Sequence, residues 1–177
     1  MRCGSPRALG LTLNSAAEKR LMDEYACLST YPDTVPALRK LRALDPRPQL
    51  AILSNGNPQM LDIAVKSAGM TGLFDRVLSV DAVRAYKPCP AAYALGTDAF
   101  GPNPRDLVFV SSNGWDVTGA AWFGYTTFWL NRTGAPAEEL GAPPDGTGAD
   151  MADLLAFLAT PAPSGRSASR ARPGPGA

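Results

Sequence analysis

Apolar side chains recur along this chain with two periods, and the segments that carry them alternate. Short continuous apolar runs predict buried strands, whereas apolar residues at every third or fourth position predict amphipathic helices. The runs predict strands over residues 49–54, 76–80, 107–111 and 125–130. The helical spacing predicts helices over residues 15–29, 35–41, 58–68, 90–100, 115–123 and from 151 onward.

Local signals mark several ends of these elements. Ser15-Ala-Ala-Glu18 has the spacing of a capping box, and Asn57-Pro58 is typical of a helix start. Residues 141–148 are rich in glycine but follow no predicted strand, so we expect a loop there. Residues 161–177 have too few apolar side chains to form a core, and we expect them to be disordered.

Strands that alternate with helices of this length predict a doubly wound α/β fold with a parallel sheet. Ligands of such sheets bind beyond the carboxyl ends of the strands. Three predicted strand ends are polar here: Ser54-Asn55, the loop of residues 81–87, and residues 111–116. The sequence therefore predicts a binding or catalytic site where these ends converge.

Each polar residue also has a purely structural interpretation. Ser54-Asn55 fits an ordinary turn and Lys87 a solvated loop. Asp116 fits an acidic residue in the first turn of a helix, where the helix dipole favours a negative charge. Ser111 and Asn113 fit groups that satisfy the backbone, while Tyr93 and Trp115 fit packing residues. Only their coincidence at three strand ends favours a site.

Composition narrows the class of protein. The 177 residues are 45% apolar and 19% charged, which suits a domain with a sizeable core. The net charge of +1 gives no reason to expect nucleic acid or an anionic membrane as partner, and the N-terminus lacks the apolar region of a signal peptide. Three scattered cysteines favour a reducing, cytoplasmic setting. The chain has no histidine, so a base active near neutral pH has to be Asp, Lys or Tyr, and Asp116 paired with Lys87 is our choice.

Three motifs resemble one known superfamily. L-A-I-L-S-N-G (50–56), L-S-V-D-A-V-R-A-Y-K-P (78–88) and F-V-S-S-N-G-W-D-V-T-G-A (109–120) are similar to the haloacid dehalogenase superfamily, in particular its L-2-haloacid dehalogenase (type II) branch. W-L-N-R-T-G (129–134) supports the same branch, and the resemblance covers roughly residues 8–160. Most superfamily phosphatases have two magnesium-binding acids in the fourth motif, and Ser112 replaces the first of them.

The resemblance implies hydrolysis of (S)-2-haloacids to 2-hydroxy acids through an aspartyl ester, with no metal and no cofactor. It implies that Ser54 and Asn55 bind the substrate carboxylate and that Trp115 shapes the pocket. Lys87 would orient the nucleophile, and Asp116 would position or activate water. Ser111, Asn113 and Tyr93 would support the nucleophile or its ester. A full-length form could also be a homodimer, and the sequence leaves this question open.

The sequence departs from this family at its N-terminus. The family's nucleophile lies on an N-terminal strand followed by Asp-x-x-Gly-Thr, which has no counterpart here. We therefore expect a fold that lacks the first central strand and most of the helical cap. Residues 1–30 would be a cap remnant, residues 31–160 the Rossmann-like core and residues 161–177 a disordered tail.

This departure leaves two other functions open and makes us expect no turnover by this chain alone. A magnesium-dependent phosphatase of the same fold needs a second acid in the fourth motif, which Ser112 argues against. A non-catalytic protein that binds small acids is favoured by the missing nucleophile. Without the central strand, the strands ending at Ser54 and Ser111 would present unpaired edges, which promote association.

Overall fold

The computed structural model describes residues 14–160, and within them all strands are paired in parallel. One sheet has the order β1-β2 and the other the order β3-β4-β5. The strands are β1 (Ala51–Ser54), β2 (Arg76–Ser79), β3 (Val108–Ser111), β4 (Thr126–Leu130) and β5 (Gly146–Gly148). The helices are α1 (Ser15–Ala26), α2 (Thr34–Arg42), α3 (Pro58–Ser67), α4 (Pro90–Phe100), α5 (Gly114–Phe123) and α6 (Met151–Ala159), with short 3₁₀ turns at Val80–Val83 and Pro104–Asp106.

The predicted α/β class is confirmed, but the described strands form two sheets. β1 and β3 belong to different sheets, so the ladder is interrupted between the strands that end at Ser54 and Ser111. This is the place where the sequence led us to expect unpaired edges. Val108 and Val110 of β3 remain 39% and 38% exposed, which is unusual for valines in the middle of an α/β protein.

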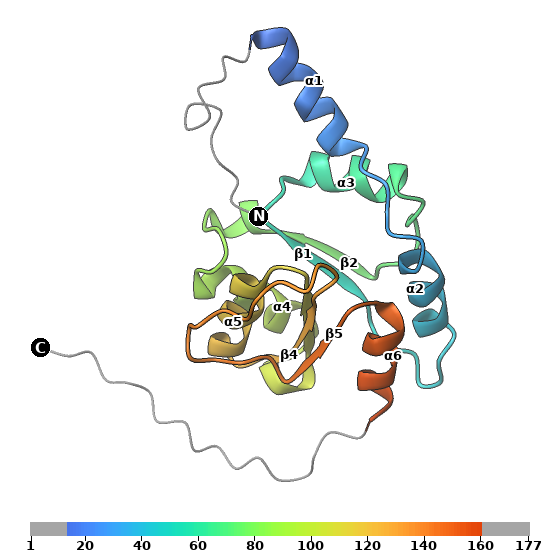
Figure 1. Cartoon of the computed structure of the whole chain (residues 1–177), viewed down its shortest axis with the longest axis vertical. Coiled ribbons are helices and arrows are strands. Elements are labelled where there is room, and N and C mark those ends of the chain that lie inside the picture. Colours follow the sequence, from blue (N-terminus) through green and yellow to red (C-terminus); the bar gives the residue numbers. More distant parts are fainter. Residues whose placement is uncertain (1–13, 161–177) are drawn as a thin grey trace, which may run out of the picture.

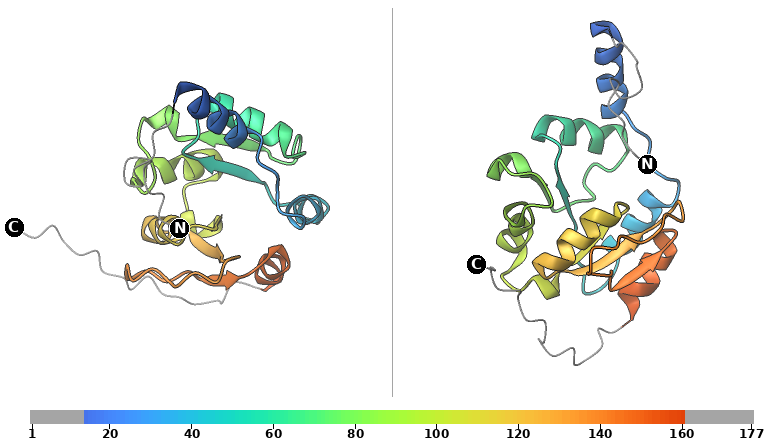
Figure 2. Two further views of the ribbon diagram at one scale, coloured as in Figure 1. Left: turned by 45° about the horizontal axis from the view of Figure 1, so that its top comes forward. Right: turned by 60° about the vertical axis from the view of Figure 1, so that its left-hand side comes forward.

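Helices cover both faces of the β3-β4-β5 sheet, as Figures 1 and 2 show. The register pairs Val110 with Phe128, so alternation places Phe109 on the opposite face from Phe128. Phe128 packs in a cluster with residues of α2 and α6, which consists of Ala37, Phe128, Leu130, Met151 and Leu154. Phe109 packs in a second cluster around α4 and α5, which consists of Tyr93, Ala120 and Tyr125 with Leu53, Leu107, Phe109 and Phe123. Because Leu53 comes from β1, the second cluster joins the two sheets.

An ion pair ties the start of α2 to the far end of the chain. Both Nη atoms of Arg132 donate to the Asp33 carboxylate, at 3.0 and 2.9 Å, and the Met151 amide donates to the same group at 2.9 Å. These donors hold the pKa of Asp33 below its usual value. Asp33 therefore anchors the N-terminus of α6, and Arg132 in the turn after β4, to the start of α2.

Most predicted elements are confirmed within one or two residues. The helix predicted over residues 15–29 ends three residues early, at Ala26, and two other details are wrong. Asn14, not Ser15, caps α1, because its Oδ1 accepts from the Ala17 amide at 2.8 Å. The segment expected to be entirely loop contains β5, whose residues pair with Phe128, Trp129 and Leu130 of β4. Gly69 ends α3 as predicted, with a φ of +67° that favours glycine.

Figure 1 shows α1 projecting from the body of the molecule, beside α3. The proposed division into a cap remnant and a core stays a prediction, and the tail predicted to be disordered lies outside the described residues. Within residues 14–160, no helix is both long and apolar enough to cross a membrane.

Candidate active site

The carboxyl end of β1 and the loop that precedes α4 are joined by a direct hydrogen bond. Asn55 follows β1, and its Oδ1 accepts from the Lys87 amide at 3.0 Å. Lys87 lies 32 residues further along the chain, so only the parallel arrangement of strands brings the two together. Two of the three predicted strand ends therefore meet.

Lys87 extends from this loop to the third strand end. Its Nζ lies 2.9 Å from Asp116 Oδ2, and the side chains of Lys87 and Asp116 are only 8% and 5% exposed. The ammonium group also lies 5.1 Å from the centre of the Phe109 ring, within reach of a cation–π interaction. Since both charges are removed from water, each depends on the other for compensation.

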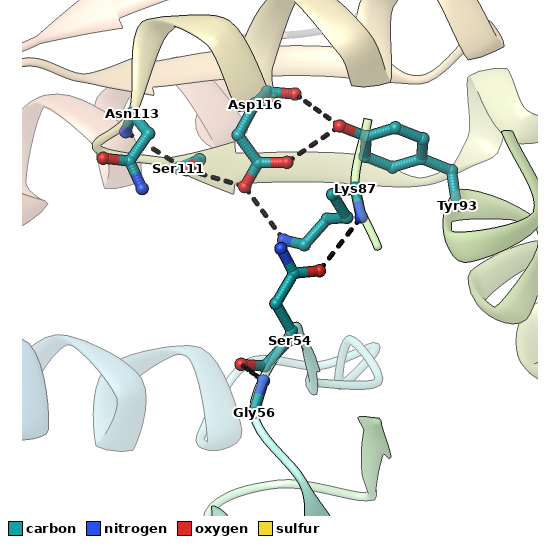
Figure 3. A network of polar contacts seen from close by, with 8 residues as sticks. Ser54, Gly56, Lys87, Tyr93, Ser111, Asn113 and Asp116 are labelled. Carbon is teal, nitrogen blue, oxygen red and sulfur yellow. Dashed lines mark hydrogen bonds and ion pairs between the residues drawn. The ribbon is translucent and has the colours of Figure 1, made fainter. Parts of the chain in front are cut away.

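Two hydroxyl groups complete the surroundings of the Asp116 carboxylate (Figure 3). The Tyr93 hydroxyl lies 2.9 Å from Oδ1, and Ser111 Oγ donates to Oδ2 at 3.1 Å. The Asn113 amide in turn donates to Ser111 Oγ at 3.2 Å. Burial raises the pKa of Tyr93, and the neighbouring Asp116 charge raises it further, so the phenol keeps its proton. The carboxylate is therefore held in one orientation by three side chains.

The remaining predicted residues lie at the margin of this network. Ser54 Oγ accepts from the Gly56 amide at 3.0 Å, which is the ordinary turn contact that the structural interpretation expects. Trp115 is 40% exposed, so it is not the core residue that a lone tryptophan suggests. Ser112 is exposed, and its carbonyl accepts from Trp129 Nε1 at 3.2 Å.

Two contributors were not predicted from the sequence. Phe109 lies under the Lys87 ammonium group, and its position two residues before Ser111, on the same face of β3, was the available signal. Gly119 lies one turn after Asp116, where a Cβ would be only 2.5 Å from the Tyr93 hydroxyl oxygen. The sequence indicated Gly119 only as part of the Gly-Ala pair at the end of the fourth motif.

This geometry can supply a base and a binding site for a small anion. A carboxylate fixed beside an ammonium group is an arrangement that can accept a proton, and the ammonium charge can attract a further carboxylate. Within residues 14–160, no three His, Cys, Asp or Glu side chains are grouped as metal ligands would be.

Comparisons with known proteins agree with these motifs. A family model for haloacid dehalogenase-like hydrolases matches residues 5–124. Haloacetate dehalogenase H-2 of Moraxella sp. (strain B) is 44% identical over 149 residues, which are 84% of this chain and 66% of that protein. The chain therefore spans just under two thirds of that relative's length.

Solved structures give the same result. A crystal structure of an L-2-haloacid dehalogenase is 60% identical with a TM-score of 0.81, covering 86% of this chain and 66% of that one. The L-2-haloacid dehalogenase of Xanthobacter autotrophicus with chloropropionic acid covalently bound is 35% identical with a TM-score of 0.77, covering 88% of this chain and 71% of that one. On its motifs, its fold and these matches, the chain belongs to the haloacid dehalogenase-like hydrolases.

Proposed function

We propose that this chain forms the core of a hydrolase for carbon–halide bonds, which converts (S)-2-haloacids into 2-hydroxy acids through an aspartyl ester. One observation carries the proposal: Asp116 is held by Lys87, Tyr93 and Ser111, while Ser112 occupies the place of the first magnesium-binding acid. A monoanionic substrate that loses a halide needs less charge neutralisation than a phosphoryl group, so a single ammonium group is sufficient. The covalently bound chloropropionic acid of the Xanthobacter relative supports an ester intermediate.

The substrate carboxylate is bound by Ser54 and Asn55 in this proposal. Asn55 Oδ1 already accepts from the Lys87 amide, so the Asn55 side chain presents its N–H groups as donors. Ser54 Oγ accepts from the Gly56 amide, and its own O–H is left to donate. The two side chains therefore offer donors at the end of β1, which suits a planar carboxylate, and the half-exposed Trp115 ring lines the apolar part of the pocket.

The reaction then has two steps. In the first, a carboxylate oxygen attacks the α-carbon, the carbon–halogen bond breaks, and the halide leaves with the bonding electrons. In the second, water attacks the carbonyl carbon of the ester while Asp116 accepts a proton from it. The ester C–O bond then breaks as the protonated Asp116 returns its proton to the leaving alkoxide oxygen, which releases the 2-hydroxy acid. The nucleophile keeps the oxygen of the water and loses its remaining proton to solvent, which restores both carboxylates. Lys87 offsets the charge of the carboxylates, and Ser111, Asn113 and Tyr93 keep Asp116 and the ester in place.

The nucleophile is the element that these residues do not supply. Asp116 is the only carboxylate that contacts Lys87 within the described part of the chain, and residues 1–13 contain no Asp or Glu. We infer that the nucleophile is carried by a further segment that lies between β1 and β3, where the ladder is interrupted. This gap also favours a second candidate function, in which the 177 residues bind small 2-substituted acids without converting them.

The test compares two proteins. One is residues 1–177 alone, and the other is the same chain extended at its N-terminus by the corresponding segment of the Moraxella relative. We expect halide release from (S)-2-chloropropionate by the extended protein only, unchanged by a chelator. Asp116→Asn should abolish it, whereas Asp81→Asn, which changes an exposed acid in the 3₁₀ turn after β2, should not.

The outcomes separate the candidates. An extended protein that needs magnesium or hydrolyses phosphate esters instead would establish the phosphatase alternative. An extended protein that binds L-lactate but releases no halide would establish the non-catalytic one. Halide release by residues 1–177 alone would contradict the assignment of the nucleophile to a further segment.

The proposed function also includes a cytoplasmic location and a small 2-haloacid as the binding partner. Cys27 and Cys89 are free and exposed, which supports a reducing, cytoplasmic setting. Sedimentation of the extended protein would decide whether it forms a homodimer.

A further inference from the structure

The Tyr93 side chain extends from α4 to Asp116 on α5, and its ring is enclosed by other aromatic side chains. The side chain is fully buried, and its hydroxyl oxygen lies 2.9 Å from Asp116 Oδ1 and 3.2 Å from the Asp116 carbonyl oxygen. Its ring is surrounded by Phe109, Phe123 and Tyr125, at centroid distances of 5.6, 6.0 and 6.3 Å. A ring held in this way cannot retreat to another rotamer without disturbing the cluster.

Gly119, one turn after Asp116 on α5, also faces the Tyr93 hydroxyl. A Cβ at this position would be 2.5 Å from the hydroxyl oxygen, 3.2 Å from Tyr93 Cζ and 3.0 Å from Pro88 Cβ. Contacts of carbon below 3.0 Å are not tolerated, so any side chain at 119 displaces Tyr93, Pro88 or the helix. Pro88 follows Lys87 directly, so the missing Cβ of Gly119 also leaves room for the segment that carries Lys87.

Tyr125 holds the backbone of Tyr93 in place. Its hydroxyl donates to the Tyr93 carbonyl and lies against Gly96 of α4, where a Cβ would collide with it. Burial raises the pKa of Tyr125 to about 12, so this hydroxyl remains a donor at neutral pH. Tyr93 is thus held at its backbone by Tyr125 and at its hydroxyl by Asp116.

We propose that Gly119 is a positioning residue, whose missing side chain sets the orientation of Asp116 through Tyr93 and thereby keeps Lys87 paired with Asp116. The proposal rests on the function proposed above, since it concerns Asp116, which activates water there, and Lys87, which offsets the charge of the carboxylates. It adds a residue of the fourth motif that touches neither substrate nor reacting atoms.

The experiment is a double-substitution cycle in residues 1–177 with Gly119→Ala and Tyr93→Phe. The first readout is labelling of Lys87 by an amine-reactive reagent, followed by peptide mass spectrometry, because Lys87 Nζ is protected only while it is paired with Asp116. The second is hydrogen exchange of the β4 amides, which reports general loosening. Gly114→Ala is the matched control on the same helix, because the three heavy atoms nearest to its Cβ would all belong to the side chain of exposed Glu138, with Cγ at 2.8 Å.

We expect Gly119→Ala to raise the rate of Lys87 labelling roughly 5- to 150-fold, with β4 exchange and the Gly114→Ala control unchanged. In the Tyr93→Phe background the hydroxyl oxygen is absent, so adding Gly119→Ala should raise the rate much less. Equal effects of Gly119→Ala in both backgrounds would overturn the proposal, as would a rise in β4 exchange that matches the rise in labelling.

Two further outcomes are also decisive. If Gly119→Ala does not fold but the double variant does, the collision with the Tyr93 hydroxyl is established. If Tyr93→Phe folds and the double variant does not, the collision lies elsewhere and the proposal fails. Because labelling requires no turnover, a failure to release halide would refute the proposed function and leave this test intact.

Discussion

Replacement of Lys87 by methionine is the most direct test of the buried ion pair. Methionine keeps most of the length of the side chain and removes only the charge. Asp116, whose side chain is only 5% exposed in the native structure, would then keep Tyr93 and Ser111 as donors but lose the ammonium group of Lys87. Breaking a buried pair by removing one partner typically costs about 3–5 kcal/mol. We expect the lower end, about 3 kcal/mol, because the two hydroxyl groups still solvate the carboxylate.

The chain offers a matched control for this substitution. Lys66 and Asp62 form a pair of similar length, 2.7 Å, but their side chains are 64% and 60% exposed. Lys66→Met removes the same charge in solvent, where such pairs contribute about 0–1 kcal/mol. The difference between the two substitutions therefore isolates the effect of burial.

The assay is urea unfolding at pH 7 for Lys87→Met, Asp116→Asn and the double variant, beside the Lys66→Met control. Removing both charges should cost less than the sum of the single losses, with a coupling of about 1–3 kcal/mol. A Lys87→Met loss as small as that of Lys66→Met would refute the reasoning, because it would mean that Asp116 does not depend on Lys87. Additive single losses would refute it equally.

Three further predictions concern other parts of the molecule. Hydrogen bonds from the Leu50 amide and Arg42 lower the pKa of Asp75 from 3.8 to about 2. The stabilising contribution of Asp75 is therefore present above about pH 3.8 and is lost as the pH falls toward 2. In the Asp75→Asn variant, the free energy of unfolding should depend less on pH in that window. In the extended protein, Asn55→Ala should weaken use of 2-haloacids roughly 5- to 150-fold in kcat/KM, and unchanged kinetics would return Asn55 to an ordinary turn residue. Arg132→Ala should lower the unfolding free energy by about 1.5–3 kcal/mol, since it removes a two-pronged charged contact to Asp33, and a loss below about 0.5 kcal/mol would show that the contact is dispensable.

The helices were predictable because their signals are local. Asn57, Pro58 and Gly69 mark α3 at both ends by backbone preferences that do not depend on distant residues. The wrong cap of α1 shows the limit of such signals, since Asn14 and Ser15 are adjacent and both can cap a helix. β5 was missed for the opposite reason: Gly146–Gly148 has no apolar pattern and is a strand only because β4 lies beside it.

The position of the candidate site was predictable from the rule for strand ends, and the pairing of Asp116 with Lys87 was predicted from the sequence. The other contacts of the site were not. That Ser54-Asn55, Lys87 and Asp116 lie together follows from parallel strands ending at one edge. That Tyr93 donates to Asp116 depends on the missing Cβ of Gly119 and on three aromatic rings, all of which are tertiary facts. The resemblance to a known family identified the residues of the site, whereas the packing of the folded chain determines which of these residues are in contact.

The polar network also has a mechanical role that follows from the interrupted ladder. No strand hydrogen bonds join β1 to β3 in the part of the chain that the structure describes, so two other links hold the sheets in register. One is the apolar cluster that contains Leu53 and Phe109, and the other is the path from Asn55 through Lys87 to Asp116. Apolar contacts fix the spacing of the sheets but not the direction of individual groups, whereas the hydrogen-bonded path fixes both. The groups proposed to carry the chemistry therefore also align the two strand ends between which a nucleophile would have to enter.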